Sequence, residues 1–534
     1  MKKKQKKMKK IRLHPISGYL LLIIITIIAS FILSLFNLQT TYNVVNSSDL
    51  SLNQVTIVIK NMLSFTGLKE IISSAAINFM SFAPLGTFLI ASIGLCVCEA
   101  SGLLKVLFGR VLEKLNGKFI TFMIIFIATI STLINDIGYV ILIPLAAIIY
   151  KSKGKNPLTG ICAAFCGVAF ASGTTIFIGS IEASIIPYTT SAARLIDSTY
   201  HVSLLSNIFI MIMSSIILSI IGTIIIEKII APKLGKYQNK KEIEINDNVE
   251  LIDEPVSEYE QEQHILSNQY NEKRGLRMAL ISFIVIVIMF IYSVIPNLPF
   301  SGLLLDMQEE TYLKQIFGNN SYFQDGFTFM ISLLFFVPGV FYGFGSRKFK
   351  NDKDLINESA KCLGYVGEMI ILIFIAAQFI SIFKMSNLGT IISSILANFL
   401  NSLEFGGIPF LIISFIVMAV ANIFLTGTQA KWIIFSPVVV SVLMRSNISP
   451  QFSQFLMRAS DSVTNGINPL FAYFVIYLGY LNYYNLDKDK PITINKAIKI
   501  IIPYFVIITI SWLFILLGWY IIGLPIGPNV YPTI

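Results

Sequence analysis

The stretch Ser460-Asp461-Ser462-Val463-Thr464-Asn465-Gly466-Ile467-Asn468-Pro469 runs directly into the apolar residues Leu470–Leu481. The chain therefore places a carboxylate, side-chain amides, a glycine and a proline at the edge of an expected membrane span. An ionisable residue inside a bilayer costs roughly 2.5–3.5 kcal/mol on insertion scales, so it is usually retained for a task. Interrupted backbone at that depth is tolerated only where protein buries it or where it lines a cavity. This stretch predicts part of a binding site within the membrane.

The composition of the whole chain is that of a membrane protein. Of its 534 residues, 55% are hydrophobic and 13% are charged, which is more apolar surface than a water-soluble domain can hide. The formal net charge of +10 comes from Lys and Arg in short loops between apolar stretches. That placement is typical of the positive-inside pattern, so we expect a lipid bilayer and no nucleic acid as partner.

Several apolar stretches are long enough to cross a bilayer. They are Gly18–Phe36, Pro84–Leu104, Leu158–Ile186, Leu204–Ile226, Met278–Ile295, Phe327–Phe344, Val366–Phe383, Val463–Leu481 and Ile500–Ile522. Two further stretches, Phe119–Tyr150 and Ile408–Met444, are too long for one crossing and carry polar residues at their middles. We expect an all-α polytopic membrane protein with about nine transmembrane helices.

Basic loops decide how the two long stretches are arranged. Lys105–Lys118 and Lys151–Lys155 flank the first of them, so both of its ends are expected on the cytoplasmic side. It must then enter the membrane and return, with Asn135-Asp136 at its tip. The second stretch must likewise enter and return from outside, which leaves Arg445 and Arg458 facing the outer side. The chain is therefore expected to contain two re-entrant helical hairpins.

The same order of elements occurs twice along the chain, in opposite orientation. We expect a basic cytoplasmic tail over residues 1–16, a first transmembrane helix over 17–36 and an extracytoplasmic loop over 37–82. The first repeat is expected over 83–228, with the inner hairpin at 119–150; a cytoplasmic acidic linker over 229–275 and a connecting pair of transmembrane helices over 276–345 follow it. The second repeat is expected over 362–525, with the outer hairpin at 408–447, and a C-terminal tail over 526–534. The stretch Leu388–Leu403, apolar on one helical face, is expected to be an interfacial or packing helix. Inverted repeats with discontinuous helices are typical of secondary transporters.

Polar residues from the two hairpin tips and the two broken spans converge if this topology holds. The candidate substrate-binding residues are Asn135, Asp136, Ser172, Thr174, Thr175, Glu182, Asn422, Thr428, Gln429, Trp432, Asp461, Asn465 and Asn468. Candidate cation-binding residues are Asn135, Asn422, Asp461 and Ser462. Their oxygen atoms suit a hard cation such as Na⁺ and not a soft transition metal. We expect Na⁺ or H⁺ as the coupling cation, with no other cofactor or metal.

Structural roles compete with these functional ones. Ser and Thr in membrane helices often bond only to their own backbone, and Asn135-Asp136 can cap the second arm of its hairpin. Glu182 can lie at the outer interface, and Trp432 can belong to an interfacial aromatic belt or stack on an aromatic ligand. A hydrolase would need a His or Lys base paired with a nucleophile, and none is evident, so we do not expect an enzyme.

Motifs along nearly the whole chain carry a resemblance to a known family. They are Asn135-Asp136-Ile137-Gly138-Tyr139-Val140, Ser386-Asn387-Leu388-Gly389-Thr390, Ala430-Lys431-Trp432 with Pro437, Asp461-Ser462-Val463-Thr464-Asn465, and Gly523-Leu524-Pro525-Ile526-Gly527-Pro528. At these residues the chain resembles the AbgT family of p-aminobenzoyl-glutamate transporters.

The resemblance implies a homodimer of nine-span protomers in a bacterial cytoplasmic membrane, with the basic N-terminus in the cytoplasm. It implies cation-coupled movement of p-aminobenzoyl-glutamate, or efflux of sulfonamide-like antimetabolites. It also adds Pro437 to the candidate site, because Asn422, Trp432, Pro437 and Asp461 fall on motif positions linked to transport. Three tracts near the expected site depart from the family pattern, so a different small anionic or aromatic ligand also fits. They are Ala171–Thr175, Glu182-Ala183 and Thr426–Gln429.

Overall fold

The computed structural model describes residues 14–45, 51–112, 115–133, 137–177, 179–237, 258–318 and 321–534. This part of the chain is mostly helical, and eight of its helices are long and apolar enough to cross a membrane. Those helices are Pro15–Leu35, Phe65–Ser101, Ile208–Leu234, Gln269–Ser293, Tyr322–Gly345, Val366–Met385, Gly407–Phe424 and Ile494–Ile522. The prediction of a mostly helical, multi-pass membrane protein is confirmed at this level.

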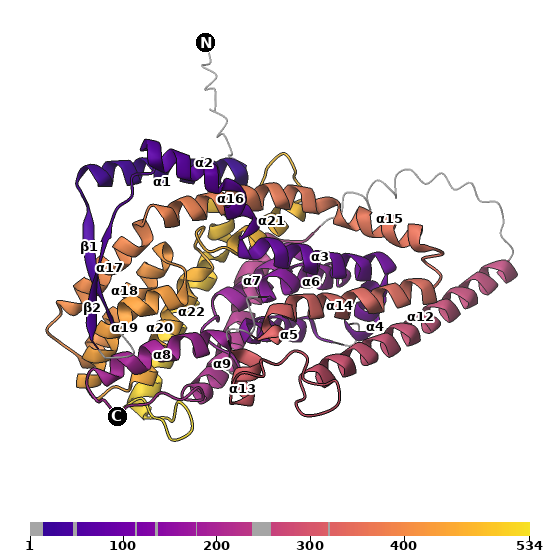
Figure 1. Cartoon of the computed structure of the whole chain (residues 1–534). Helices are drawn as coiled ribbons and strands as arrows, with labels where there is room; N and C mark the ends of the chain where they lie inside the picture. Colours follow the sequence, from indigo (N-terminus) through magenta and orange to yellow (C-terminus); the bar gives the residue numbers. More distant parts are fainter. Residues whose placement is uncertain are drawn as a thin grey trace, which may run out of the picture.

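The N-terminal region departs from the prediction of an all-α chain. After helix α1 (Pro15–Leu35), strands β1 (Gln39–Val45) and β2 (Leu52–Val58) pair antiparallel. Their alternating Thr, Tyr and Val side chains favour a pleated, half-exposed ribbon. The ribbon packs beside α17 and α19 at one edge of the molecule (Figure 1). Helix α2 (Phe65–Met80) follows, so the segment expected to be a loop contains both strand and helix.

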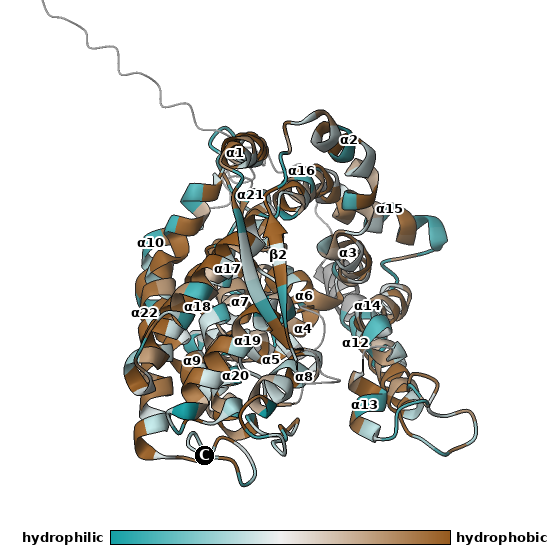
Figure 2. Cartoon of the chain, turned by 60° about the vertical axis from the view of Figure 1, so that its left-hand side comes forward, coloured by the Kyte–Doolittle hydropathy of each residue, from teal (hydrophilic) through white to brown (hydrophobic). Residues whose placement is uncertain are grey.

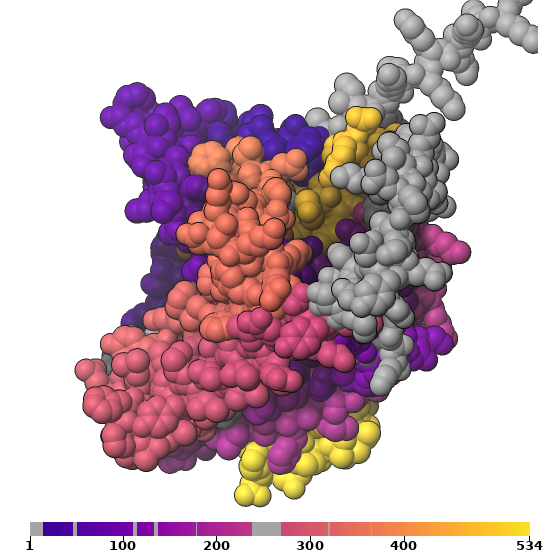
Figure 3. Space-filling view, turned by 90° about the vertical axis from the view of Figure 1, so that its right-hand side faces the viewer, coloured from indigo at the N-terminus to yellow at the C-terminus, as the bar shows by residue number. Residues whose placement is uncertain are grey.

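An outer group of helices surrounds the contact between α3 (Ala83–Ser101) and α14 (Tyr322–Gly345). Its other members are α4 (Leu103–Leu112), α12 (Glu258–Ser293), α13 (Tyr312–Phe317), α15 (Asp352–Cys362) with the short 3₁₀ turn η3 (Leu363–Tyr365), and α16 (Val366–Met385). A Cβ added at Gly339 would lie 2.8 Å from Cys98 Cα, so α14 and α3 approach closely through a small residue. Figures 2 and 3 show α12 and α14 together on one side of the molecule.

Part of the segment predicted as an acidic linker, 229–275, is helical. Residues 258–275 belong to the long helix α12, and residues 238–257 lie outside the described part of the chain. On the N-terminal side of residues 238–257, helix α9 (Ile208–Ile225) continues through a π-helical turn, η2 (Ile226–Ile230), into helix α10 (Ala231–Leu234).

The first half of the inner group is built on α7 (Pro157–Ala169). Helices α5 (Gly117–Ile130) and α6 (Gly138–Ser152) form a pair that packs against α7, with the short 3₁₀ turn η1 (Ser131–Leu133) following α5. Asn156 begins α7, because its side chain accepts a hydrogen bond from Leu158 N and Pro157 occupies the first helical position. Helix α7 ends at Ala169, and helix α8 (Ser180–Arg194) begins after a non-helical segment. The break predicted within Leu158–Ile186 is present.

The second half of the inner group also contains a helix pair followed by further helices. Helix α17 (Leu388–Asn401) precedes the pair α18 (Gly407–Phe424) and α19 (Thr428–Arg445); α20 (Pro450–Asn465), α21 (Phe474–Tyr483) and α22 (Ile494–Ile522) follow. The predicted span Val463–Leu481 begins in the wrong place. Its polar residues form the last turns of α20, which starts at Pro450, and the break covers residues 466–473.

The outside of the molecule carries many exposed apolar side chains, and one buried helix carries polar ones. Large side chains are exposed on α1, α12 and α22, among them Ile24, Ile284 and Ile510, which is the surface expected against lipid. Helix α20, by contrast, is buried along its whole length although it carries Arg458 and Asp461. Protein, and not lipid, surrounds its polar residues.

Candidate functional site

The break between α7 and α8 lies directly against α20. Gly173 N donates a hydrogen bond to Ser462 Oγ over 2.6 Å. A Cβ added at Gly173 would lie 2.6 Å from Arg458 O and 2.8 Å from Ser462 Oγ, closer than real Cβ atoms approach. The absence of a side chain at Gly173 therefore lets the broken segment meet the helix that carries Asp461.

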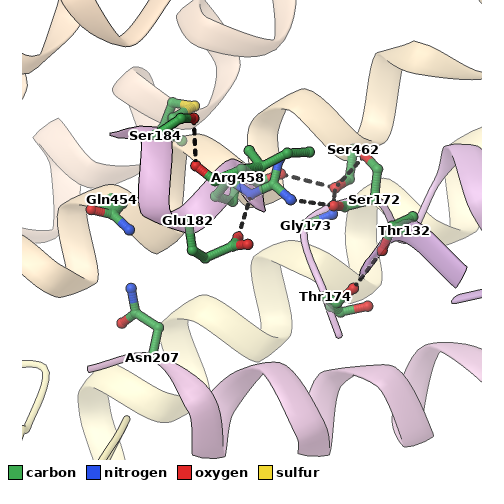
Figure 4. A network of polar contacts seen from close by, with 12 residues as sticks. Thr132, Ser172, Gly173, Thr174, Glu182, Ser184, Asn207, Gln454, Arg458 and Ser462 are labelled. Atoms are coloured by element: carbon green, nitrogen blue, oxygen red, sulfur yellow. Dashed lines mark hydrogen bonds and ion pairs between the residues drawn. The ribbon is translucent and has the colours of Figure 1, made fainter. Parts of the chain in front are cut away.

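The first charged pair of the site joins this break to α20. Arg458 Nε lies 2.9 Å from Glu182 Oε1, and its Nη2 donates to Ser172 O over 2.5 Å. Figure 4 shows the guanidinium directed at both partners. Arg458 is 4% exposed and Glu182 is 5% exposed, so both charged side chains are buried inside protein. An arginine in an otherwise charge-poor region is buried here because a carboxylate and a backbone carbonyl satisfy its donors.

The second charged pair joins α18, α19 and α20. Lys431 Nζ forms an ion pair with Asp461 Oδ1 and a hydrogen bond with Asn422 Oδ1. Lys431 and Asp461 are each only 1% exposed. The other carboxylate oxygen, Asp461 Oδ2, is buried and has no hydrogen-bond partner among the described residues. The described residues therefore use only part of the hydrogen-bonding capacity of this buried carboxylate.

Asn465 connects the two charged pairs into one network. Asn422 Nδ2 lies 2.8 Å from Asn465 Oδ1, and Asn465 Nδ2 donates to Ser172 Oγ over 3.0 Å. Asn468 Nδ2 donates to Asn422 O over 3.0 Å, which ties the break after α20 to the end of α18. We call this set the polar network; its members are Ser172, Glu182, Asn422, Lys431, Arg458, Asp461, Ser462 and Asn465.

Some predicted ligands bond elsewhere in the structure. Ser462 Oγ donates to Arg458 O over 2.8 Å and accepts from Gly173 N, so it belongs with Arg458 and not with the Asp461 carboxylate. Thr174 Oγ1 donates to Ala171 O over 2.9 Å, and Thr175 Oγ1 accepts from Phe177 N over 3.2 Å. Both threonine hydroxyls therefore stabilise the broken backbone locally.

Trp432 is fully buried inside the protein. Its Nε1 donates to Thr189 Oγ1 over 2.8 Å, and Thr189 Oγ1 lies 2.6 Å from Gln454 Oε1. The indole is enclosed by protein in this conformation. Pro437 is buried inside α19.

The start of α19 is the exposed part of the candidate site. Gln429 is exposed, and its Nε2 donates to Tyr188 OH over 3.0 Å, while Thr428 is half-buried beside it. Asn135 and Asp136, predicted at the tip between α5 and α6, lie outside the described residues. Within the described ranges there is no group of three or more His, Cys, Asp or Glu side chains that could hold a metal ion.

Lys431 and Arg458 are the charged residues whose place in the site the sequence did not reveal. A signal existed for Lys431, because it is a lysine next to the apolar run of α19 in a segment expected to be inside the membrane. The partner of each cation is distant along the chain, so spacing alone could not pair them.

The sequence is similar to a family model, to a protein of Escherichia coli and to proteins of solved structure. The family model described as "AbgT putative transporter family" matches residues 8–534. The p-aminobenzoyl-glutamate transport protein of Escherichia coli (strain K12) is 29% identical over 521 residues, which cover 98% of this chain and 94% of that protein. Among solved structures, the Alcanivorax borkumensis YdaH transporter is 26% identical with a TM-score of 0.47, covering 97% of this chain and 100% of that one.

Neisseria gonorrhoeae MtrF, whose structure is described as illuminating a class of antimetabolite efflux pumps, is 29% identical with a TM-score of 0.46. The match covers 98% of each chain. These relatives are named as transporters or pumps. Since the family model extends over nearly the whole length of the sequence, the chain belongs to the AbgT family of transporters.

Proposed function

We propose that the chain is an ion-coupled secondary transporter that moves p-aminobenzoyl-glutamate, or a related aromatic anionic metabolite, across the bacterial cytoplasmic membrane. Family membership and the name of the Escherichia coli relative support the substrate class. The observation that carries the coupling is Asp461, a buried carboxylate beside a helix break with one oxygen that lacks a partner among the described residues. A buried carboxylate oxygen is a suitable ligand for a hard cation or a proton, which here would take the place of the Lys431 ammonium as counter-charge of Asp461.

The proposed site combines the polar network with the exposed start of α19. Asp461 and Asn422 would receive the coupling cation, Na⁺ or H⁺, through oxygen atoms that suit either. Thr428 and Gln429 would contact the substrate first, since they are accessible in this conformation. Asn135 and Asp136, which lie outside the described residues, are also proposed as substrate-binding residues.

We also propose the topology that such a mechanism needs: nine crossings, two re-entrant hairpins, an inverted repeat and a cytoplasmic N-terminus, assembled as a homodimer. The lengths of the helices support the first hairpin. Helix α5 has 14 residues and α6 has 15, so each extends only ~21–23 Å at 1.5 Å per residue, which is less than the ~30 Å hydrocarbon core. The equal order of elements in the two halves supports the repeat.

A counterflow assay in proteoliposomes tests the function. We expect labelled p-aminobenzoyl-glutamate to exchange into vesicles that contain unlabelled substrate, and to accumulate only with an inward Na⁺ or proton gradient. Asp461→Asn removes the charge that the cation neutralises, so it should abolish gradient-driven accumulation. The control is Asp325→Asn, because Asp325 is exposed on α14. Gradient-driven accumulation by Asp461→Asn at the wild-type rate would contradict the assignment.

Export of sulfonamide-like antimetabolites is the alternative function. With an inward cation gradient, co-transport of substrate and cation gives import, whereas exchange of substrate for the cation at the same binding site gives export. Host cells that express the protein should then tolerate sulfonamides better than cells that express Asp461→Asn. Unchanged tolerance, together with uptake of p-aminobenzoyl-glutamate, would favour import.

A further inference from the structure

The ammonium group of Lys431 stands where the coupling cation is expected. It contacts Asp461 Oδ1 and Asn422 Oδ1, two oxygens of the proposed cation site. A lysine ammonium is a compact cation with three donors, so it neutralises Asp461 in the way that a bound ion would. The chain therefore carries its own cation in this site.

A coupling cation at Asp461 and the Lys431 ammonium compete for the same carboxylate. Both side chains are almost fully buried, and in such surroundings like charges repel strongly while opposite charges attract. The unpartnered Asp461 Oδ2 offers a first contact to an incoming cation or proton. Once Asp461 is neutralised, the attraction that holds the Lys431 ammonium in place is lost.

The exposed start of α19 lies immediately beside Lys431. Gly427, Gln429 and Ala430 are all exposed, and Lys431 has a flexible four-carbon stem that can redirect its charge. Helix α19 also begins there without a side-chain cap, at Gly427, so its first amide groups favour a negative charge. A released Lys431 ammonium would join these amides in facing an anion.

The charges around Lys431 leave it few other partners. Asn422 comes from α18, Asp461 from α20, and Arg458, one helical turn before Asp461, is held by Glu182 of α8. With Asp461 neutralised and Glu182 paired to Arg458, none of the described carboxylates of the polar network remains for Lys431.

We propose that Lys431 couples the two ligands by exchanging partners. Asp461 and Asn422 hold its ammonium while the site is without a coupling cation, and neutralisation of Asp461 releases the ammonium to bind a carboxylate of the substrate. This inference deepens the proposed function and takes its substrate class from it. It explains why an anionic substrate would bind only after the cation, which is the condition for coupled transport.

Equilibrium binding of labelled p-aminobenzoyl-glutamate to the purified full-length protein tests the exchange. We expect wild-type protein to bind only with Na⁺ or at acidic pH, and not in choline at neutral pH. Asp461→Asn should bind in choline at neutral pH, because its neutral amide no longer retains Lys431. Lys431→Met should bind at least about tenfold more weakly under every condition, as loss of a charge-assisted hydrogen bond predicts.

The matched control is Lys384→Met, which removes an exposed lysine at the end of α16 and should bind like wild type. Thermal unfolding of each variant separates lost binding from lost folding. Wild-type binding by a folded Lys431→Met, or an unchanged cation requirement in Asp461→Asn, would overturn the proposal.

A second measurement does not depend on the substrate. Acetic anhydride modifies accessible amines, and mass spectrometry reports the modified fraction of Lys431, with Lys384 as internal standard. We expect Lys431 labelling to rise with Na⁺, and to be high in Asp461→Asn without Na⁺. Equal labelling in all these states would overturn the exchange. If wild type fails to bind p-aminobenzoyl-glutamate but shows the labelling change, only the substrate assignment fails.

Discussion

At the scale of single residues, the site buries four charged side chains inside the protein. Glu182, Lys431, Arg458 and Asp461 lie on three helices and form two opposite-charge pairs. Burying such a pair costs desolvation energy that a hydrophobic replacement would avoid. Their presence therefore favours a role in binding and coupling over a role in stability alone.

The Arg458–Glu182 pair predicts a specific pattern of stability. Arg458→Met should destabilise the protein by roughly 3–5 kcal/mol, because it leaves the Glu182 carboxylate buried without a counter-charge. The double variant Glu182→Gln with Arg458→Met should recover much of that loss, since no unpaired charge remains. Thermal unfolding of the purified proteins measures both.

An exposed ion pair provides the control for this cycle. Lys361 Nζ lies 2.6 Å from Glu358 Oε1 at the surface of α15, so Lys361→Met should change stability by less than about 1 kcal/mol. If Arg458→Met destabilised the protein no more than Lys361→Met does, the buried ion pair would contribute less to stability than its burial predicts.

At the scale of the elements, the broken segment after α7 and the end of α20 act as one unit. Their contact depends on the absence of a side chain at Gly173, which leaves room for Arg458 O and Ser462 Oγ. The hydrogen bonds that join Ser172 and Gly173 to Ser462 form because the two segments lie this close together.

Gly173→Ala should separate the break from α20. The new Cβ would need one of the two backbones to shift, at a cost of roughly 1–3 kcal/mol, and the Arg458 contact with Ser172 O should weaken with it. We expect a lower unfolding temperature and slower counterflow. Gly326→Ala in α14, where an added Cβ meets nothing within 4 Å, should leave both unchanged; equal effects of the two substitutions would refute the role given to Gly173.

The elements also show what the sequence could predict. Unbroken apolar spans were found from length and hydropathy, because lipid contact requires an apolar surface along the whole helix. The start of α20 was missed, since Gln451, Gln454 and Arg458 make it too polar for a lipid-facing span. It is stable inside the membrane region only because other helices bury it, and that requires tertiary structure. The strands β1 and β2 were missed because they are short and half-exposed.

At the scale of the whole molecule, many apolar side chains are exposed on the outside, and the polar network is buried. Leu280, Ile284 and Ile288 on α12 are exposed, so they meet lipid or, in the proposed homodimer, a second copy of the chain. Ile284→Arg should cost roughly 2.5–3.5 kcal/mol near the middle of that span and lower the yield of membrane-inserted protein. Ile284→Leu is the control.

Native mass spectrometry separates the two explanations for this surface. A variant that inserts well but becomes monomeric would assign Ile284 to the dimer interface. A variant that inserts and assembles like wild type would contradict both assignments.

The sequence predicted the residues of the site better than their partners. Asp461 and Asn422 could be singled out because polar groups in apolar surroundings are visible in the sequence alone. The pairing of Lys431 with Asp461, and of Arg458 with Glu182, joins residues that are 30 and 276 positions apart. Such pairs arise from the packing of α8, α19 and α20, for which a single sequence carries no direct signal.

The balance of charge in the polar network has an electrical consequence. Two acidic and two basic side chains sum to zero among its described members, so an unloaded network that crosses the membrane field carries no net charge. The membrane potential contributes about 2.3 kcal/mol per elementary charge per 100 mV. It would then change the rate of the step in which the carrier moves with cation and substrate bound, and would not change the rate of the return step of the empty carrier. The sign and size of the transport current would report directly how many cations accompany each anion.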